Sequence, residues 1–267
     1  MDVFDVKCGN SPLILAFPHT GTFIPENIHH NLNEKGQILA DTDWYVDRLY
    51  DGLVDDVTTV RALFHRYVID ANRDPADVSL YPGQNTTSLV PVTDFDGCPI
   101  WFENPDSAEI EQRKELYHAP YHASLQAEID RVKEMHGFAV LYDCHSIRSH
   151  IPFLFEEKLP DFNVGTNSGK TTIPSMEQAV LNVLVKAAGY DHVLNGRFKG
   201  GWTTRHYGDP ENNIYAIQME LAQSTYLEKE KPPFAYDSEK ATALQIHLKE
   251  ILEAILADVK TYSNNGR

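Results

Sequence analysis

The stretch Ala139–Arg148, AVLYDCHSIR, decides the fold of this chain. It begins as an apolar run and ends in the polar tetrapeptide DCHS at positions 143–146. A buried strand of a parallel sheet has this pattern, apolar inside the sheet and polar where the strand emerges. Because ligands of open α/β sheets bind at the outer ends of the strands, the pattern predicts a functional site at this edge.

Two further stretches repeat the pattern. Ser11–Gly21, SPLILAFPHTG, ends just after His19, and Asn213–Ala222, NIYAIQMELA, carries Glu220 near its end. Three strands are therefore expected to bring His19, His145 and Glu220 together. Two imidazoles and a carboxylate at strand ends suit a catalytic zinc ion with a general base.

The rest of the chain alternates between strand-like and helix-like segments. Helices are predicted over 106–135, with a kink or break at Pro120, over 175–189 with Ser175 as N-cap and Gly189 after its end, and over 238–261. Further strands are predicted over 3–8, over 57–69 and beginning at His192, and a glycine-rich loop is expected after the last of them. Residues 81–105 and 156–175 are expected to be loops. This alternation predicts one α/β domain with a mixed, mostly parallel sheet.

Composition narrows the class of protein. The 267 residues are 42% hydrophobic, enough for a sizeable core, and the net charge of −16 argues against a nucleic-acid partner. A small acidic substrate remains compatible, because a few arginines in a pocket can override the global charge. The three cysteines have no framework spacing, and no apolar run could span a bilayer or form a secretory signal. We expect a cytoplasmic protein without a membrane partner, either a monomer or a small homo-oligomer.

A catalytic zinc site normally has a third protein ligand. The segment DTDWYVDRLYDGLV, Asp41–Val54, has its apolar residues at helical spacing, and it follows the loop that carries His19. Asp43 and Asp47 lie four residues apart and are expected on one side of this helix. Asp43 is the preferred third ligand and Asp47 the alternative.

Two carboxylates have further predicted roles. Side chains alternate along a strand, so Asp143 shares a face with His145 and can accept a hydrogen bond from the ring nitrogen that does not bind the metal. Glu220 is costly to bury unless it is paired or used, which favours a general base. Each of the three residues also has a purely structural alternative. His19 would be hydrogen-bonded within a turn, His145 would be hydrogen-bonded at the edge of the sheet, and Glu220 would pair with an arginine.

Planar guanidinium groups bind carboxylates in bidentate fashion, so arginines near a metal indicate an acidic substrate. A structural salt bridge is the alternative for each of them. The candidate substrate-binding residues are Asn72, Arg73, Arg148, Arg197, Arg205 and His206. His118 and His122 are four residues apart on a predicted helix, but they lack a carboxylate partner in the sequence and are expected either to be packing groups or to support residues of the site.

The motifs FPHTG, DTDWYVDRLY, RYVIDANRDP, YHAPYH, LYDCHSIRS, GGWTTRHYG and QMEL occur in this order along the chain. In this combination the chain resembles the N-formylglutamate amidohydrolases, a family distantly similar to the zinc carboxypeptidases. The resemblance spans nearly the whole chain. It implies a single catalytic domain over residues 1–267 with a three-layer α/β/α fold of the carboxypeptidase, or phosphorylase/hydrolase-like, type.

The resemblance also implies an activity, the hydrolysis of N-formyl-L-glutamate to formate and L-glutamate in histidine degradation. One divalent metal, expected to be Zn²⁺, would be held by His19, one of the two aspartates and His145, with Glu220 as the base. Iron, cobalt and manganese also accept such ligands. Asn72–Arg73 resembles the Asn-Arg pair that binds a terminal carboxylate in the carboxypeptidases.

One position departs from the carboxypeptidase pattern. Those enzymes have a glutamate ligand three residues after the first histidine, where this chain has Thr22. The alternative activities are that of a carboxypeptidase or of a deacylase for another N-acyl acidic amino acid. A non-catalytic protein that binds acidic amino acids is the alternative outside enzymes.

Overall fold

The structure is a computed structural model that describes residues 2–80 and 83–265, with side chains up to residue 261. One sheet runs through the molecule in the order β1-β3-β2-β4-β7-β5-β6. Its strands are β1 (Phe4–Lys7), β2 (Leu13–Phe17), β3 (Thr58–Ala62), β4 (Ala139–Ile147), β5 (Phe162–Gly165), β6 (His192–Leu194) and β7 (Ile214–Ala222).

The central strands β3, β2, β4 and β7 are parallel to one another. Antiparallel pairing occurs where β1 joins β3 and where β5 joins β7, while β6 is parallel to β5. The predicted mixed, mostly parallel sheet is thus confirmed. Because parallel neighbours end at the same edge, the polar ends of β2, β4 and β7 lie side by side.

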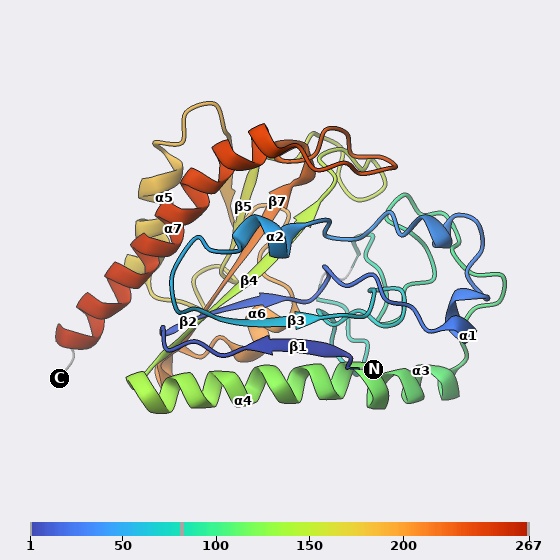
Figure 1. Ribbon diagram of the computed structural model, residues 1–267, viewed down its shortest axis with the longest axis horizontal. Helices are drawn as coiled ribbons and strands as arrows, with labels where there is room; N and C mark the ends of the chain where they lie inside the picture. Colours follow the sequence, from blue (N-terminus) through green and yellow to red (C-terminus); the bar gives the residue numbers. More distant parts are fainter. Residues whose placement is uncertain (1, 81–82, 266–267) are drawn as a thin grey trace.

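The sheet is buried on both faces because side chains alternate along each strand. In β4, Val140 and Tyr142 pack with the helices α5 (Pro174–Leu184) and α7 (Ser238–Asn265). Ala139 and Leu141 pack with α4 (Ala119–His136) on the other face. The result is the expected three-layer α/β/α arrangement, with α4 and α7 on opposite sides of the sheet (Figure 1). Asp143 and His145 continue the face that packs on α4.

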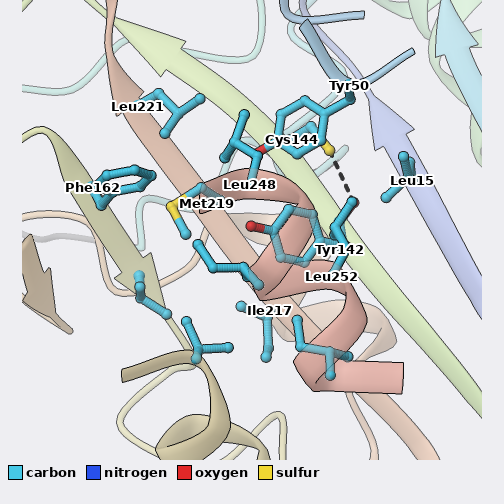
Figure 2. Close-up of a cluster of buried hydrophobic side chains, with 14 of the residues drawn as sticks. Leu15, Tyr50, Tyr142, Cys144, Phe162, Ile217, Met219, Leu221, Leu248 and Leu252 are labelled. Carbon is cyan, nitrogen blue, oxygen red and sulfur yellow. Dashed lines mark hydrogen bonds between the residues drawn. The ribbon is translucent and has the colours of Figure 1, made fainter. Parts of the chain in front are cut away.

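The helices are α1 (Glu26–His29), α2 (Val46–Tyr50), α3 (Ser107–Arg113), α4 (Ala119–His136), α5 (Pro174–Leu184), α6 (Trp202–Tyr207) and α7 (Ser238–Asn265). Short turns are η1 (Gly36–Ile38), η2 (Lys114–His118), η3 (Pro210–Asn212) and η4 (Gln223–Thr225). In α7, fully buried Leu244, Leu248 and Leu252 repeat every four residues and form its inner face. Figure 2 shows Leu248 and Leu252 packed over Ile217 and Met219 of β7.

Several local predictions need correction. Strand β5 lies inside the predicted loop 156–175, because its four residues gain their stability from pairing with β7 rather than from a local pattern. Helix α6 lies in the predicted glycine-rich loop, where Thr203, Thr204 and Tyr207 form a buried helical face. Helix α5 begins at Pro174 rather than after Ser175, since proline suits a first helical position, and it ends well before Gly189.

The break expected at Pro120 takes the form of the π-helical turn η2, which ends two residues before the proline. A π-helical turn changes the hydrogen-bonding partners, so the missing N–H of proline does not stop the helix. The long segment continues through α4 to His136, where Gly137 takes the left-handed conformation that ends it. None of the helices in residues 2–80 and 83–265 combines the length and apolar character needed to cross a bilayer.

The helix predicted over Asp41–Val54 is much shorter in the structure. Tyr45 has a φ of 59°, a left-handed conformation that a helix cannot include, so α2 begins at Val46. Asp43 therefore lies in the turn before the helix, where its N–H donates to the carbonyl oxygen of His19 at 3.1 Å. Asp43 and Asp47 do not share a helix side as predicted.

Candidate active site

A cavity lies at the carboxyl ends of β2, β4 and β7, the edge at which the sequence predicts a site. It is lined by His19, which follows β2, by His145 of β4 and by Glu220 of β7. Four apolar side chains contribute to the wall: Phe95, Ile147, Leu154 and Phe198. A cavity with apolar walls and a few converging polar groups is typical of a small-molecule site.

Three possible metal ligands converge beside this cavity. Nδ1 of His19 lies 3.2 Å from Nδ1 of His145 and 3.7 Å from Oδ2 of Asp43, and the remaining pair, His145 Nδ1 and Asp43 Oδ2, is 3.1 Å apart. Ligands about 2.1 Å from a tetrahedral ion lie about 3.4 Å from one another. All three residues are buried, and their spacing and chemistry fit one divalent cation.

A buried carboxylate orients the first imidazole. Nε2 of His19 lies 2.6 Å from Oδ1 of Asp70, which fixes the proton on Nε2 and leaves the Nδ1 lone pair facing the other ligands. Burial acts to raise the pKa of Asp70, but His19 and Arg73 outweigh it and hold that pKa well below its ordinary value. Asp70 is therefore an ionised acceptor, the usual partner of a metal-binding histidine.

Asp143 has the corresponding position behind the second imidazole. Its Oδ1 lies 3.1 Å from Nε2 of His145, and this buried oxygen has no hydrogen-bond donor within the described part of the chain. The amide Nδ2 of Asn72 lies 3.0 Å from the same nitrogen. Nε2 of His145 therefore faces an acceptor, Asp143, and a donor, Nδ2 of Asn72, and a cation bound at Nδ1 would require the proton of the ring on Nε2, facing Asp143. Nδ1 is then a second lone-pair donor.

Neighbouring groups hold the carboxylate of Asp43 so that one of its oxygens faces the two histidines. Its Oδ1 accepts from Arg66 at 2.7 Å, and its Oδ2 accepts from the backbone N–H of Ser146 at 3.1 Å. Burial acts to raise the pKa of Asp43, but Arg66 and the two histidines lower it far below the ordinary value. An ionised oxygen beside two imidazoles is a suitable cation ligand.

Asp47, the alternative ligand, lies elsewhere. Its Oδ2 pairs with Arg61 at 2.5 Å, and about a third of its side chain is exposed to solvent. The structure therefore brings Asp43, and not Asp47, to the two histidines.

Glu220 lies next to His145 across parallel strands, since the two residues are register partners of β7 and β4. Its side chain is 7% exposed. Desolvation raises the pKa of Glu220 to about 8, although the nearby His145 acts in the opposite direction. A carboxyl group whose pKa is raised toward neutrality by burial is suited to exchanging protons.

Two of the predicted arginines line the cavity together with Asn72. Nη2 of Arg73 donates to Oγ1 of Thr87 at 3.0 Å, and its Nε lies 3.7 Å from Oδ2 of Asp70. Arg197 donates to the carbonyl oxygens of Leu154 and Asn85 at 3.2 and 3.1 Å. These contacts hold both guanidinium groups at the wall, where an acidic ligand can meet them.

The other three predicted substrate-binding residues do not line the cavity. Arg148 lies 3.0 Å from Asp96, and Arg205 donates to the carbonyl oxygen of Gly200 at 2.8 Å. His206 stacks on Trp202, with ring centroids 4.2 Å apart. The cause for Arg205 and His206 is the unpredicted helix α6, which buries its threonines and turns these two residues outward.

The cavity residues that sequence reasoning missed include Arg66, Gln218, and Asp70 as the partner of His19. A weak signal existed for two of them. Asp70 precedes Asn72 by two residues, and Gln218 precedes Glu220 by two in an alternating strand, so each pair has a common face. Arg66 had no such signal, since its role depends on contact with Asp43.

Comparison with known proteins identifies the family of this chain. The sequence model of the N-formylglutamate amidohydrolase family matches residues 11–227. N-formylglutamate deformylase of Pseudomonas putida is 46% identical over 93% of this chain and 94% of that protein. The protein of the same name from Pseudomonas aeruginosa is 44% identical over 96% and 97%.

A solved structure has the same fold. The N-formylglutamate amidohydrolase from Ralstonia eutropha JMP134 aligns over 100% of both chains with a TM-score of 0.79, at 24% sequence identity. The family match covers most of the chain, and it includes both histidines and Glu220. The chain belongs to the N-formylglutamate amidohydrolase family.

Proposed function

We propose that the protein hydrolyses N-formyl-L-glutamate and that a single divalent metal, zinc, assists the reaction. Water adds to the formyl carbon and the carbon–nitrogen bond breaks, giving formate and L-glutamate. The observation that carries the proposal is the buried triangle of His19, Asp43 and His145 beside Glu220. Close relatives bear the name N-formylglutamate deformylase, which supports this substrate.

The ligand set would be His19, Asp43 and His145, backed by Asp70 and Asp143. A cation bound there would supply Lewis acidity to the attacking water and to the formyl carbonyl. Imidazole and carboxylate donors in a tetrahedral spacing suit zinc, although iron, cobalt and manganese bind the same donors. The metal content of the purified protein decides among them.

Glu220 takes the proton of the attacking water and returns it to the nitrogen of the leaving amine. Its burial and its place beside His145 support this role, because a base must lie near the reacting water and hold its proton only briefly. The protonated nitrogen leaves as the neutral amine, which then takes the remaining proton of the water from formic acid, so no further acid is required.

Recognition of the two glutamate carboxylates is assigned to Arg73 and Arg197, with Asn72 as a hydrogen-bond donor. Both arginines line the cavity. Their bidentate geometry suits carboxylates, and their charges offset the repulsion between an acidic substrate and a protein of net charge −16. Residues 1–267 would act as one catalytic domain, since a single sheet carries all these groups.

The test is formate production from N-formyl-L-glutamate by the purified protein, before and after chelation and after addition of each metal. We expect formate release that chelation abolishes and zinc restores. Release that survives exhaustive chelation would overturn the metal proposal. Faster turnover of a peptide or of another N-acyl acidic amino acid would overturn the substrate, and glutamate binding without hydrolysis of any of these compounds would identify a binding protein.

A further inference from the structure

The amide of Gln218 lies between a backbone segment and the carboxylate of Glu220. Its Oε1 accepts from the N–H of Gly201 at 2.6 Å, and its Nε2 donates to Oε2 of Glu220 at 3.1 Å. Gln218 and Glu220 are two residues apart on β7, so both face the cavity. Gln218 is 3% exposed, and water has little access to it.

The orientation of this amide is determined by its neighbours. A backbone N–H can only donate, so the atom that faces Gly201 must be the amide oxygen. The NH₂ group is consequently turned toward Glu220, and a carboxylate accepts from it. A buried glutamate carboxylate without such a donor would be free to adopt other rotamers.

Glycines allow the segment to come this close. Gly165 of β5 is the cross-strand partner of Gln218, and a Cβ added to Gly165 would lie 2.4 Å from the backbone nitrogen of Gly200. Gly200 itself has a φ of 104°, a conformation that favours glycine. The backbone at 200–201 therefore rests directly on β5, within reach of Gln218.

The same segment orients a second amide of the site. The N–H of Thr203 donates to Oδ1 of Asn72 at 2.8 Å, which turns Nδ2 of Asn72 toward His145. A Cβ added to Gly201 would lie 2.4 Å from that Nδ2. Two backbone donors at the start of α6 thus set the direction of two amide side chains in one cavity.

We propose that Gln218 is a positioning residue for Glu220, held in its orientation by the backbone of Gly201. The inference rests on the proposed function, because it assumes that Glu220 exchanges the reaction's protons. Gln218 does not itself take part in bond making. It keeps the carboxylate directed at the water and the leaving amine, and displacement of a reacting group by about 1 Å can cost a hundredfold in rate.

The first test compares Gln218→Met with Gln245→Met. Methionine has a similar length but can neither accept from Gly201 nor donate to Glu220. We expect kcat to fall by about ten- to a hundredfold while KM for N-formylglutamate changes less than about twofold. Gln245 of α7 donates to the carbonyl oxygen of Leu49 at 2.9 Å, away from the cavity, and its substitution is expected to leave kcat unchanged.

The second test is a double-mutant cycle with Glu220→Gln. If Gln218 acts through Glu220, adding Gln218→Met to Glu220→Gln lowers kcat less than about twofold further. Calorimetry of L-glutamate binding gives a readout apart from turnover, and the affinity of Gln218→Met is expected to match that of the parent. Should Gln218→Met fail to fold, Gln218→Glu replaces it in the cycle, because this side chain still accepts from Gly201.

The inference would be overturned by a parental kcat in the Gln218 variant, or by a full additional loss of kcat in the Glu220→Gln background. A loss of glutamate affinity as large as the loss of kcat would do the same, because Gln218 would then act on substrate binding. If the parent protein itself releases no formate, the proposed function fails instead. The two failures are therefore distinguishable.

Discussion

At the scale of single residues, the site consists of charged groups that are each held by a partner. Arg66 holds the oxygen of Asp43 that faces away from the histidines, and Asp70 holds the far nitrogen of His19. Such outer partners fix the ring orientation and the protonation state of metal ligands. The inner atoms are thereby left as electron-pair donors directed at one another.

Glu220→Gln tests the proposed base. Glutamine has nearly the same shape but cannot take a proton from water, so kcat is expected to fall by about 10²- to 10⁴-fold, the usual contribution of a general base. Binding of L-glutamate, measured by calorimetry, should persist. Turnover close to that of the parent would remove Glu220 from the mechanism.

Asp70→Asn tests the partner of His19. An amide cannot stabilise the proton on Nε2 as a carboxylate does, so zinc affinity is expected to fall by about ten- to a hundredfold, measured by competition with a chelator. Asp47→Asn is the matched control, since Asp47 pairs with Arg61 outside the site. Equal effects of the two substitutions on zinc affinity would contradict the assigned role.

At the scale of elements, α7 covers one face of the sheet and α4 covers the other (Figure 1). The strand residues His145, Gln218 and Glu220 of the site continue the face that packs on α4. Substitutions in α7 can therefore change the stability of the fold without changing a residue of the site. Residues of α7 support β7 from behind without touching the cavity.

Leu248→Ala makes use of this separation. Leu248 is fully buried against β7 (Figure 2), and its truncation is expected to lower the free energy of unfolding by about 2–5 kcal/mol. KM should be unchanged in the folded enzyme. Ile246 of the same helix is 57% exposed, so Ile246→Ala is expected to change stability by less than about 0.5 kcal/mol. Denaturant titration of both variants checks this difference.

His122 joins α4 to two other parts of the chain. One ring nitrogen lies 2.8 Å from the carbonyl oxygen of Ala71, and the other lies 2.9 Å from the hydroxyl of Tyr207 in α6. Burial lowers the pKa of His122 to about 3, and the neighbouring His118 acts in the same direction. The neutral ring can donate to Ala71 and accept from Tyr207, so both ring nitrogens are hydrogen-bonded while the ring stays uncharged. His122 is thus a neutral packing group, one of the two roles that the sequence analysis leaves open for it.

Stability should therefore decline in mild acid. The unfolded state binds a proton at His122 near pH 6.5 and the folded state only near pH 3, so the stabilisation is complete above pH 6.5 and is lost as the pH falls toward 3. His122→Gln removes this pH-dependent contribution to the free energy of unfolding. Between pH 7 and pH 5 the parent should lose about 2 kcal/mol more than the variant, measured by urea unfolding of the chelated proteins. Parallel curves would contradict the prediction.

At the scale of the whole molecule, metal binding and folding should be coupled. The three ligands come from the loop after β2, from the turn before α2 and from β4, so only the folded chain brings them together. A ligand that binds only the folded state stabilises it in proportion to the logarithm of its concentration over its Kd.

Chelation is therefore expected to lower Tm by about 5 °C or more, and zinc is expected to restore it. The measurement is differential scanning calorimetry of the same preparation with and without chelator. Asp43→Asn, which lacks one ligand, should show a smaller shift on chelation. An unchanged Tm in the parent would mean that no metal is tightly held.

The sequence by itself determined the central parallel strands, the edge at which the site lies and the placement of His19, His145 and Glu220. These follow from short-range patterns, because an apolar run indicates the buried part of a strand and the polar residues after it indicate where the strand reaches the edge of the sheet. The same patterns separated the two sheet faces, so that Asp143 could be assigned to the face of His145.

Only the tertiary structure decided which aspartate joins the histidines, which arginines line the cavity and what holds Glu220. Tyr45 adopts a left-handed conformation, so that α2 begins only after it, and α6 turns Arg205 and His206 outward. Arg66, Asp70 and Gln218 gain their roles from contacts with residues that are distant in the chain or on other elements. Local sequence patterns report the burial of a segment but not which distant groups meet, because those contacts depend on how the elements pack.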